Sequence, residues 1–201
     1  FTFNNQSIGG WNTPTEDLMA AYETGDKRKA ASVMDGYTES GKFVAQPFIK
    51  KYFNLPFPAP NGSSPNTNDN WPVYRYAEVL LLLAEVLNEQ GKAGEALPHL
   101  NAVRTRAGLA AVSNNNQAQL RDVLQKERRI ELVFENKRWL DLVRTGKAIE
   151  VISAYGSKLK ASGKHTYLLS STYNVTANRL LFPIPFSERQ VNPNLTQNPG
   201  Y

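Results

Sequence analysis

The sequence predicts a mainly α-helical fold joined to an irregular, loop-rich region with few short strands. Two stretches, 73–90 and 94–107, place apolar residues at helical spacing, and each is followed by a glycine. A third stretch, 117–143, combines dense charge with an apolar stripe. Residues 1–72 are rich in Gly, Pro, Asn and aromatics, which favours loops. A chain of 201 residues is long enough to bury one core without disulfides or metal.

The first 72 residues are expected to hold one short helix and some extended segments. The helix is predicted over 14–22, where Thr13 or Thr15 can cap its first turn. Short extended segments are expected within 43–53. The stretch 56–70 contains four prolines and no apolar period, so we expect it on the surface, where binding loops are common.

The stretches 73–90 and 94–107 are predicted to form an antiparallel helical hairpin, with Gly91 and Gly108 ending the two helices. The expected core positions are Ala77, Leu80, Leu81, Ala84, Leu87, Ala96, Leu97, Leu100 and Val103. Small residues at the crossing points and a glycine turn make this hairpin resemble one tetratricopeptide unit. One such unit cannot bury its own apolar face and needs stacked neighbours, but the sequence contains no second copy.

A third helix is predicted over 117–143, and it carries a row of three acidic residues. Glu127, Glu131 and Glu135 fall at i, i+4 and i+8, so they share one helix face. Paired carboxylates can bind metals or divide acid and base roles. However, neither of the two histidines, His99 and His165, lies in a Glu-x-x-His pair. Basic residues three positions away favour structural ion pairs, and Trp139 is expected to pack.

The last part of the chain is predicted to be mostly non-helical. A short helix is expected over 148–155, followed by a polar loop that contains Gly156 and Gly163. Prolines recur to the end of the chain, so we expect the segment 156–201 to wrap the body as an irregular tail.

Composition excludes several function classes. The net charge is +5, but 23 basic residues are offset by 18 acidic ones along the chain, with no basic stripe, so we expect no nucleic-acid partner. There is no cysteine for a disulfide, thiolate metal site or nucleophile, and no apolar run approaches the roughly 20 residues of a membrane helix. Phosphate-binding glycine motifs and a Gly-x-Ser-x-Gly elbow are absent. We therefore expect no catalytic residues, no metal and no cofactor.

Aromatic residues in asparagine-rich loops are the remaining candidates for a binding site. Sugars present apolar C–H faces, which can stack on exposed aromatic rings, and a rim of hydroxyls, which can hydrogen-bond to polar side chains beside those rings. Trp11, Phe57 and Trp71 are predicted as stacking platforms, with Asn12 and Asn68 as hydroxyl partners. The alternative, that these rings anchor loops to the core, stays open because large aromatics are usually buried.

Four segments together resemble the SusD/RagB family of outer-membrane glycan-binding lipoproteins. They are PTEDLMAAYETGDKR at 14–28, VYRYAEVLLLLAEVLNEQG at 73–91, ERRIELVFENKRWLDLVRTG at 127–146 and LFPIPFSERQVNPNLTQNPGY at 181–201. Their order and spacing agree with the family, and the last three are specific. The resemblance implies a carboxy-terminal domain over 1–201, without the family's amino-terminal repeats or lipidated cysteine.

The resemblance also implies a function and a location. We expect a ligand-side loop region over 1–72, a helical scaffold over 73–155 whose exposed apolar faces pair with residues outside this chain, and the tail over 156–201. Family members bind oligosaccharides without cleaving them and deliver them to a SusC-like TonB-dependent transporter. They sit on the outer membrane surface, held by a lipid anchor that would lie outside this chain. The alternative is a tetratricopeptide-like protein-docking module without a sugar site of its own.

Overall fold

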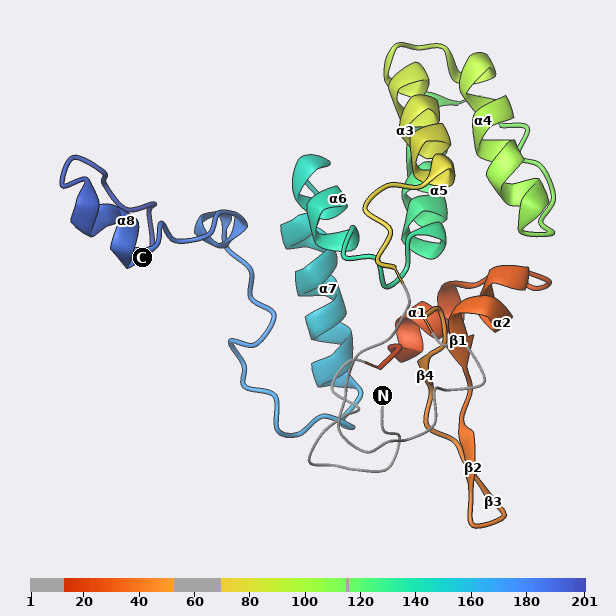
Figure 1. The fold of residues 1–201 in the computed structure, drawn as a ribbon, viewed down its shortest axis with the longest axis horizontal. Helices are drawn as coiled ribbons and strands as arrows, with labels where there is room; N and C mark the ends of the chain where they lie inside the picture. The colour runs from red at the N-terminus through yellow and green to blue at the C-terminus, as the bar shows by residue number, and fades with distance from the viewer. Residues whose placement is uncertain (1–12, 53–69, 115) are drawn as a thin grey trace. The chain divides into compact units, whose positions relative to one another are not determined.

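The computed structural model describes residues 13–52, 70–114 and 116–201, without the side chain of Glu39. The chain divides into two compact units, Phe1–Lys137 and Arg138–Tyr201, which are described separately (Figure 1). About 51% of the described residues are helical and the strands among them are few and short, which confirms the predicted fold class.

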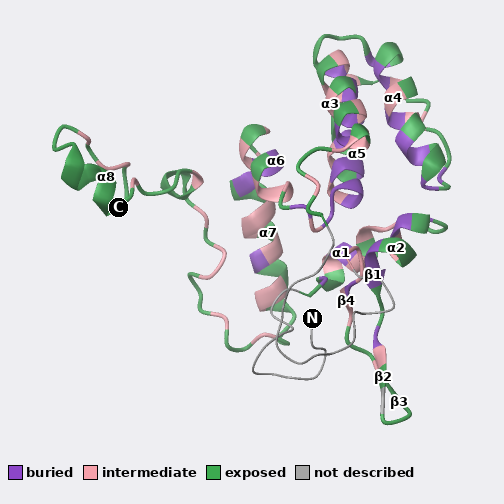
Figure 2. Ribbon diagram, in the orientation of Figure 1, coloured by how far each residue is buried: buried purple, intermediate pink, exposed green. Residues whose placement is uncertain are grey.

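The predicted hairpin is present in the first unit. Helix α3 (Tyr76–Glu89) packs against α4 (Ala93–Arg106), and both contact α5 (Gln117–Glu131). Buried residues line these three helices (Figure 2). The buried side chains of this core are Leu81, Ala84, Ala93, Ala96, Leu100, Val103, Leu120 and Leu124. Apolar residues at helical spacing therefore form one core among the three helices.

One polar residue near the end of α3, Asn88, is fully buried, whereas Glu89 and Gln90 beside it are exposed. Nδ2 of Asn88 donates to the carbonyl of Gln117 at 3.0 Å, and Nε2 of Gln117 donates to the carbonyl of Asn88 at 2.7 Å. These two hydrogen bonds tie α3 to the first turn of α5, whereas Oδ1 of Asn88 is buried without a hydrogen-bond partner in the described part of the structure.

Two short helices and two strand pairs precede the hairpin. Helix α1 (Glu16–Ala21) begins after Thr15, whose hydroxyl accepts from the N–H of Leu18, and α2 (Lys27–Ser32) begins after Asp26. Strand β1 (Val33–Met34) pairs antiparallel with β4 (Phe48–Ile49), and β2 (Tyr37–Glu39) pairs antiparallel with β3 (Lys42–Val44). Extended segments within 43–53 are therefore confirmed over the part that is described. The β1–β4 pair leads directly into Lys51 and Tyr52.

The prediction of one helix over 117–143 is wrong. Helix α5 ends at Glu131, and a new helix, α6 (Arg138–Arg144), begins in the second unit. Between them Phe134 and Asn136 take the left-handed backbone region, with φ of 64° and 58°. Residues in this backbone region interrupt the helical hydrogen bonds, so the helix ends here. The apolar spacing in the sequence continues past this point and therefore gave no sign of the break.

The second unit contains more helix than the sequence predicts. Helix α7 (Ala148–Ala161) runs past the predicted end at residue 155, so Gly156 lies inside a helix and not in a loop. A 3₁₀ turn (Ala177–Leu180) and the helix α8 (Phe186–Val191) follow in the segment expected to be irregular. Pro185 does not disrupt α8 because it precedes the first helical residue, where no helical N–H is needed.

Candidate functional site

The acidic row predicted on the third helix lies in a buried network of ions. Glu127, Glu131 and Glu135 are each 2–3% exposed. Glu127 accepts from Arg28 at 2.6 Å and from Arg104 at 2.8 Å. A structural, ion-paired role for this row is therefore confirmed. The cations that pair with Glu127 are not residues three positions away, as expected, but lie 99 and 23 positions away in the chain.

Glu131 is the centre of this network. Its carboxylate pairs with Arg28 at 3.2 Å, with Arg75 at 3.0 Å and with Arg106 at 2.6 Å. Burial by itself would raise the pKa of Glu131, but hydrogen bonds and positive charge from the arginines, Arg75 foremost, lower it overall. At the rim of the network, a hydrogen bond from Arg104 holds the pKa of Glu23 at about 2. A carboxylate that pairs with three guanidinium groups is held as a structural anion.

Arg75 and Lys51 connect the network to the end of α5. Nζ of Lys51 donates to the carbonyls of Glu131 and Val133 at 2.9 and 3.1 Å, and Nη2 of Arg75 donates to the carbonyl of Glu131 at 2.9 Å. Cations suit this position because the carbonyl end of a helix carries partial negative charge. These two residues, from sequence segments remote from α5, satisfy carbonyls at and just beyond its end.

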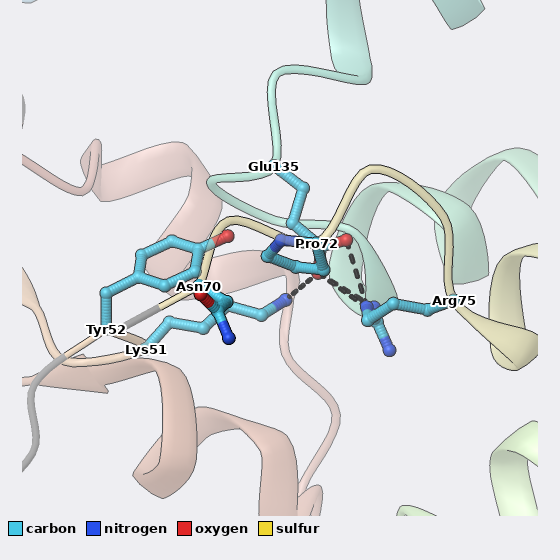
Figure 3. A pocket seen from close by; sticks show the side chains of 6 residues that line it. All are labelled: Lys51, Tyr52, Asn70, Pro72, Arg75 and Glu135. Atoms are coloured by element: carbon cyan, nitrogen blue, oxygen red, sulfur yellow. Dashed lines mark hydrogen bonds and ion pairs between the residues drawn. The ribbon is translucent and has the colours of Figure 1, made fainter. Parts of the chain in front are cut away.

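A pocket of about 300 Å³ lies beside this helix end (Figure 3). The residues that line it are Lys51, Tyr52, Asn70, Pro72, Arg75 and Glu135. Figure 3 shows that Lys51 and Arg75 both reach Glu135, at 2.5 and 2.8 Å. Burial lowers the pKa of Lys51, although hydrogen bonding and the negative charge of Glu135 oppose this effect. Burial, and to a smaller extent the negative charge of Glu135, raises the pKa of Tyr52. The pocket thus combines an aromatic ring, an amide and an internally paired set of charges.

Trp71 lies between the lining residues Asn70 and Pro72 in the sequence, and its ring stacks on the ring of Tyr52. Its ring centroid is 4.9 Å from that of Tyr52, and the two planes meet at 24°. Trp71 nevertheless remains 51% exposed, so it is more than a loop anchor buried in the core. An aromatic face that is both supported from behind and open to solvent can accept the apolar face of another ring.

Of the predicted binding residues, the described part of the structure contains Trp71. Trp11, Asn12, Phe57 and Asn68 lie outside the described residues. The prediction missed Tyr52, Lys51 and Arg75. Tyr52 carried a weak signal, as an aromatic residue at the end of the extended segment. Lys51 and Arg75 carried none, because their role depends on carbonyls about 60 to 80 residues away.

No metal site accompanies the pocket in the described ranges. Within them, no group of three or more His, Asp or Glu side chains is placed to hold a metal ion. The acidic residues of the network are engaged by cations from the protein itself. What the described pocket offers chemically is contact and hydrogen bonding.

The fold and the sequence segments both match one known family. The family model described as "SusD family" matches residues 4–201. This chain belongs to the SusD family. The SusD-like protein P38 of Formosa agariphila is 34% identical to it, over 94% of this chain and 34% of that protein. The starch-binding protein SusD of Bacteroides thetaiotaomicron is 29% identical, over 92% of this chain and 30% of that protein.

A solved structure agrees with this membership. The surface glycan-binding protein A from Bacteroides uniformis is 30% identical, with a TM-score of 0.66, over 92% of this chain and 40% of that chain. The present SusD-family chain spans about a third of the length of the curated relatives it matches.

Proposed function

We propose that this SusD-family chain is part of a cell-surface protein that binds oligosaccharides without cleaving them and delivers them to a SusC-like TonB-dependent transporter. The observation that carries the proposal is the exposed ring of Trp71, which stacks on Tyr52 beside an open pocket. Relatives described as starch-binding and surface glycan-binding support the choice of ligand. Glu135, which lines the pocket, is ion-paired to Lys51 and Arg75 and is not positioned as a free acid or base.

The remaining predicted platforms extend this proposal. Trp11 and Phe57, with Asn12 and Asn68, are proposed to add rings and amides to the surface that begins at Trp71. We further propose a location on the outer membrane surface, with a lipid anchor outside this chain. None of the helices in the described ranges has the length and hydropathy of a membrane span.

Replacing Trp71 by alanine tests the proposal. Burying about 60–90 Å² of apolar sugar surface on the ring contributes roughly 1.5–2.2 kcal/mol, so we expect binding to weaken about 10- to 50-fold. The measurement is affinity electrophoresis in gels that contain amylopectin, xyloglucan, galactomannan, agarose, polygalacturonate or carrageenan, followed by calorimetry with the polymer that retards the protein.

Tyr167→Ala is the control for this experiment, because it also removes an exposed aromatic ring, 76% exposed, and Tyr167 is not among the residues that line the pocket. The control should bind like the unmodified protein. If Trp71→Ala and the unmodified protein bind with equal affinity, Trp71 is not part of the binding site. If no polymer retards the unmodified protein, the proposed glycan-binding function is contradicted.

A second candidate function, docking of a helical protein surface, is favoured by the outer face of α3. Tyr76, Val79, Leu83 and Val86 recur at helical spacing and are 76%, 51%, 41% and 51% exposed. They form the α3 stripe. Tetratricopeptide-like hairpins stack through such faces, so the occupant that fits is another helical hairpin. On this second proposal the stripe would receive a hairpin of a partner protein.

The double substitution Val79→Asp with Val86→Asp separates the two candidates. If the α3 stripe docks a partner protein, the double substitution should reduce the amount of SusC-like transporter complex that co-purifies at least tenfold. The Tm and the glycan affinity should not change. Leu169→Asp, at a residue that is 71% exposed in the second unit, is the control. A clear fall in Tm would instead show that the stripe packs inside the longer polypeptide, and unchanged capture would refute docking through this face.

A further inference from the structure

The positive charges that line the pocket have their hydrogen-bonding capacity directed into the protein. An ammonium group has three hydrogens to donate. Nζ of Lys51 lies 2.5 Å from a carboxylate oxygen of Glu135, and it donates to the carbonyls of Glu131 and Val133. These three contacts match its three hydrogens, so a ligand anion would have to displace one of them.

Arg75 is also engaged within the protein, where its contacts account for four of the five N–H groups of the guanidinium. Its Nε donates to both carboxylate oxygens of Glu135 at 3.0 Å, and Nη1 donates to Glu131 at 3.0 Å. Its Nη2 donates to the carbonyl of Glu131 at 2.9 Å. All three guanidinium nitrogens therefore have partners within the protein, two of them carboxylates.

The charges around the pocket balance only when the ion pairs behind its lining are counted. Lys51 and Arg75 are the two positive lining residues and Glu135 is the negative one; Glu131, which does not line the pocket but pairs with Arg75, supplies the second negative charge. Arg28 and Arg106 also pair with Glu131. Arg28 is shared with the buried Asp26 and Glu127, and Arg106, whose side chain is 58% exposed, is largely solvated. Together, the lining residues and the ion pairs behind them leave little unpaired positive charge to attract an anion.

We propose that this pocket selects uncharged sugar residues and discriminates against sulfated and uronate ones. The inference rests on the glycan-binding function proposed above and specifies its ligand. An anionic sugar would compete for Lys51 and Arg75 with the carbonyls of Glu131 and Val133 and with the carboxylate of Glu135. Drawing Lys51 away from the carbonyl of Val133 would cost that acceptor its hydrogen bond. A neutral sugar can stack on Trp71 and bond to the amide of Asn70 without disturbing these contacts.

The test compares polymers that differ in charge on the same backbone. Amylopectin, galactomannan and agarose are each used unmodified, after oxidation of the C6 hydroxyl to a carboxylate, and after methyl esterification of that carboxylate. Polygalacturonate and carrageenan complete the set as natural anionic polymers. Dissociation constants of the full chain and of Trp71→Ala are measured at about 50 and 500 mM NaCl.

The expected result is binding of at least one neutral polymer that depends on Trp71 and does not change with salt. Its oxidised form should bind at least tenfold more weakly, and the methyl ester should restore affinity, which assigns the loss to charge. Tighter binding of an anionic polymer that depends on Trp71 and weakens with salt would overturn the selectivity and leave the glycan-binding function standing. Binding to none of the polymers would overturn both.

Discussion

Replacing Glu131 by alanine is expected to destabilise the first unit by about 3–5 kcal/mol, the usual cost of removing one partner from a buried ion pair. Glu131 is 3% exposed and is shared by Arg28, Arg75 and Arg106. Its loss removes the carboxylate that Arg75 and Arg106 share, and it leaves Arg75 and Lys51 with Glu135 as their one common carboxylate. Urea unfolding followed by circular dichroism measures the change.

The matched control is an ion pair of similar geometry on the surface. Glu89 accepts from Nε and Nη2 of Arg121 at 2.6 and 2.7 Å, but both side chains are exposed. Water screens such a pair, so Glu89→Ala should shift the urea midpoint little. Equal shifts for Glu131→Ala and Glu89→Ala would show that burial does not govern the strength of the network.

The same substitution should change how stability depends on pH. The pKa of Glu131 is lowered in the folded protein, and that of Glu23 lies at about 2 against 4.5 for the free group. A lowered carboxyl pKa adds stability above the unfolded value, and that stability is lost as the pH falls toward the folded value. The unmodified protein should therefore weaken below about pH 4.5, and Glu131→Ala should show a shallower loss over the same range.

The second large effect is expected at Gly156, inside α7. A Cβ atom added there would lie 2.2 Å from Cβ and 2.8 Å from Cγ of Tyr173. Tyr173 has little freedom to withdraw because the clash is close to its backbone, which already has a φ of 66°. Helix propensity alone would make Gly156→Ala favourable, but the overlap should dominate and destabilise the second unit by about 3 kcal/mol. Thermal unfolding and hydrogen exchange of the α7 amides measure the change.

Gly94 provides the control for this substitution. It also lies in a helix, α4, but an added Cβ there would meet nothing within 4 Å. Gly94→Ala should therefore stabilise the protein by about 0.5–1 kcal/mol through helix propensity. A Gly156→Ala protein that is as stable as Gly94→Ala would mean that Tyr173 does not pack against α7 in solution.

The fold class could be predicted from local patterns. Apolar residues at helical spacing identified α3 and α4, including the buried Leu81 and Leu100, and glycines after each helix indicated where they end. The binding site could be predicted less well. Trp71 had a signal of its own, an aromatic residue beside an asparagine-rich loop. Lys51 and Arg75 had none, because basic residues near loops are common and their partners lie in another part of the chain.

By itself, the sequence determined the mainly helical class, the α3–α4 hairpin and the family, because these depend on residues close together in the chain. The tertiary structure alone decided where α5 ends and which cations pair with Glu127, Glu131 and Glu135. The reason is physical. Periodicity reports which face of a helix is apolar, but the end of α5 and the pairing of its carboxylates depend on Lys51, Arg75 and Arg28, which folding brings from distant segments.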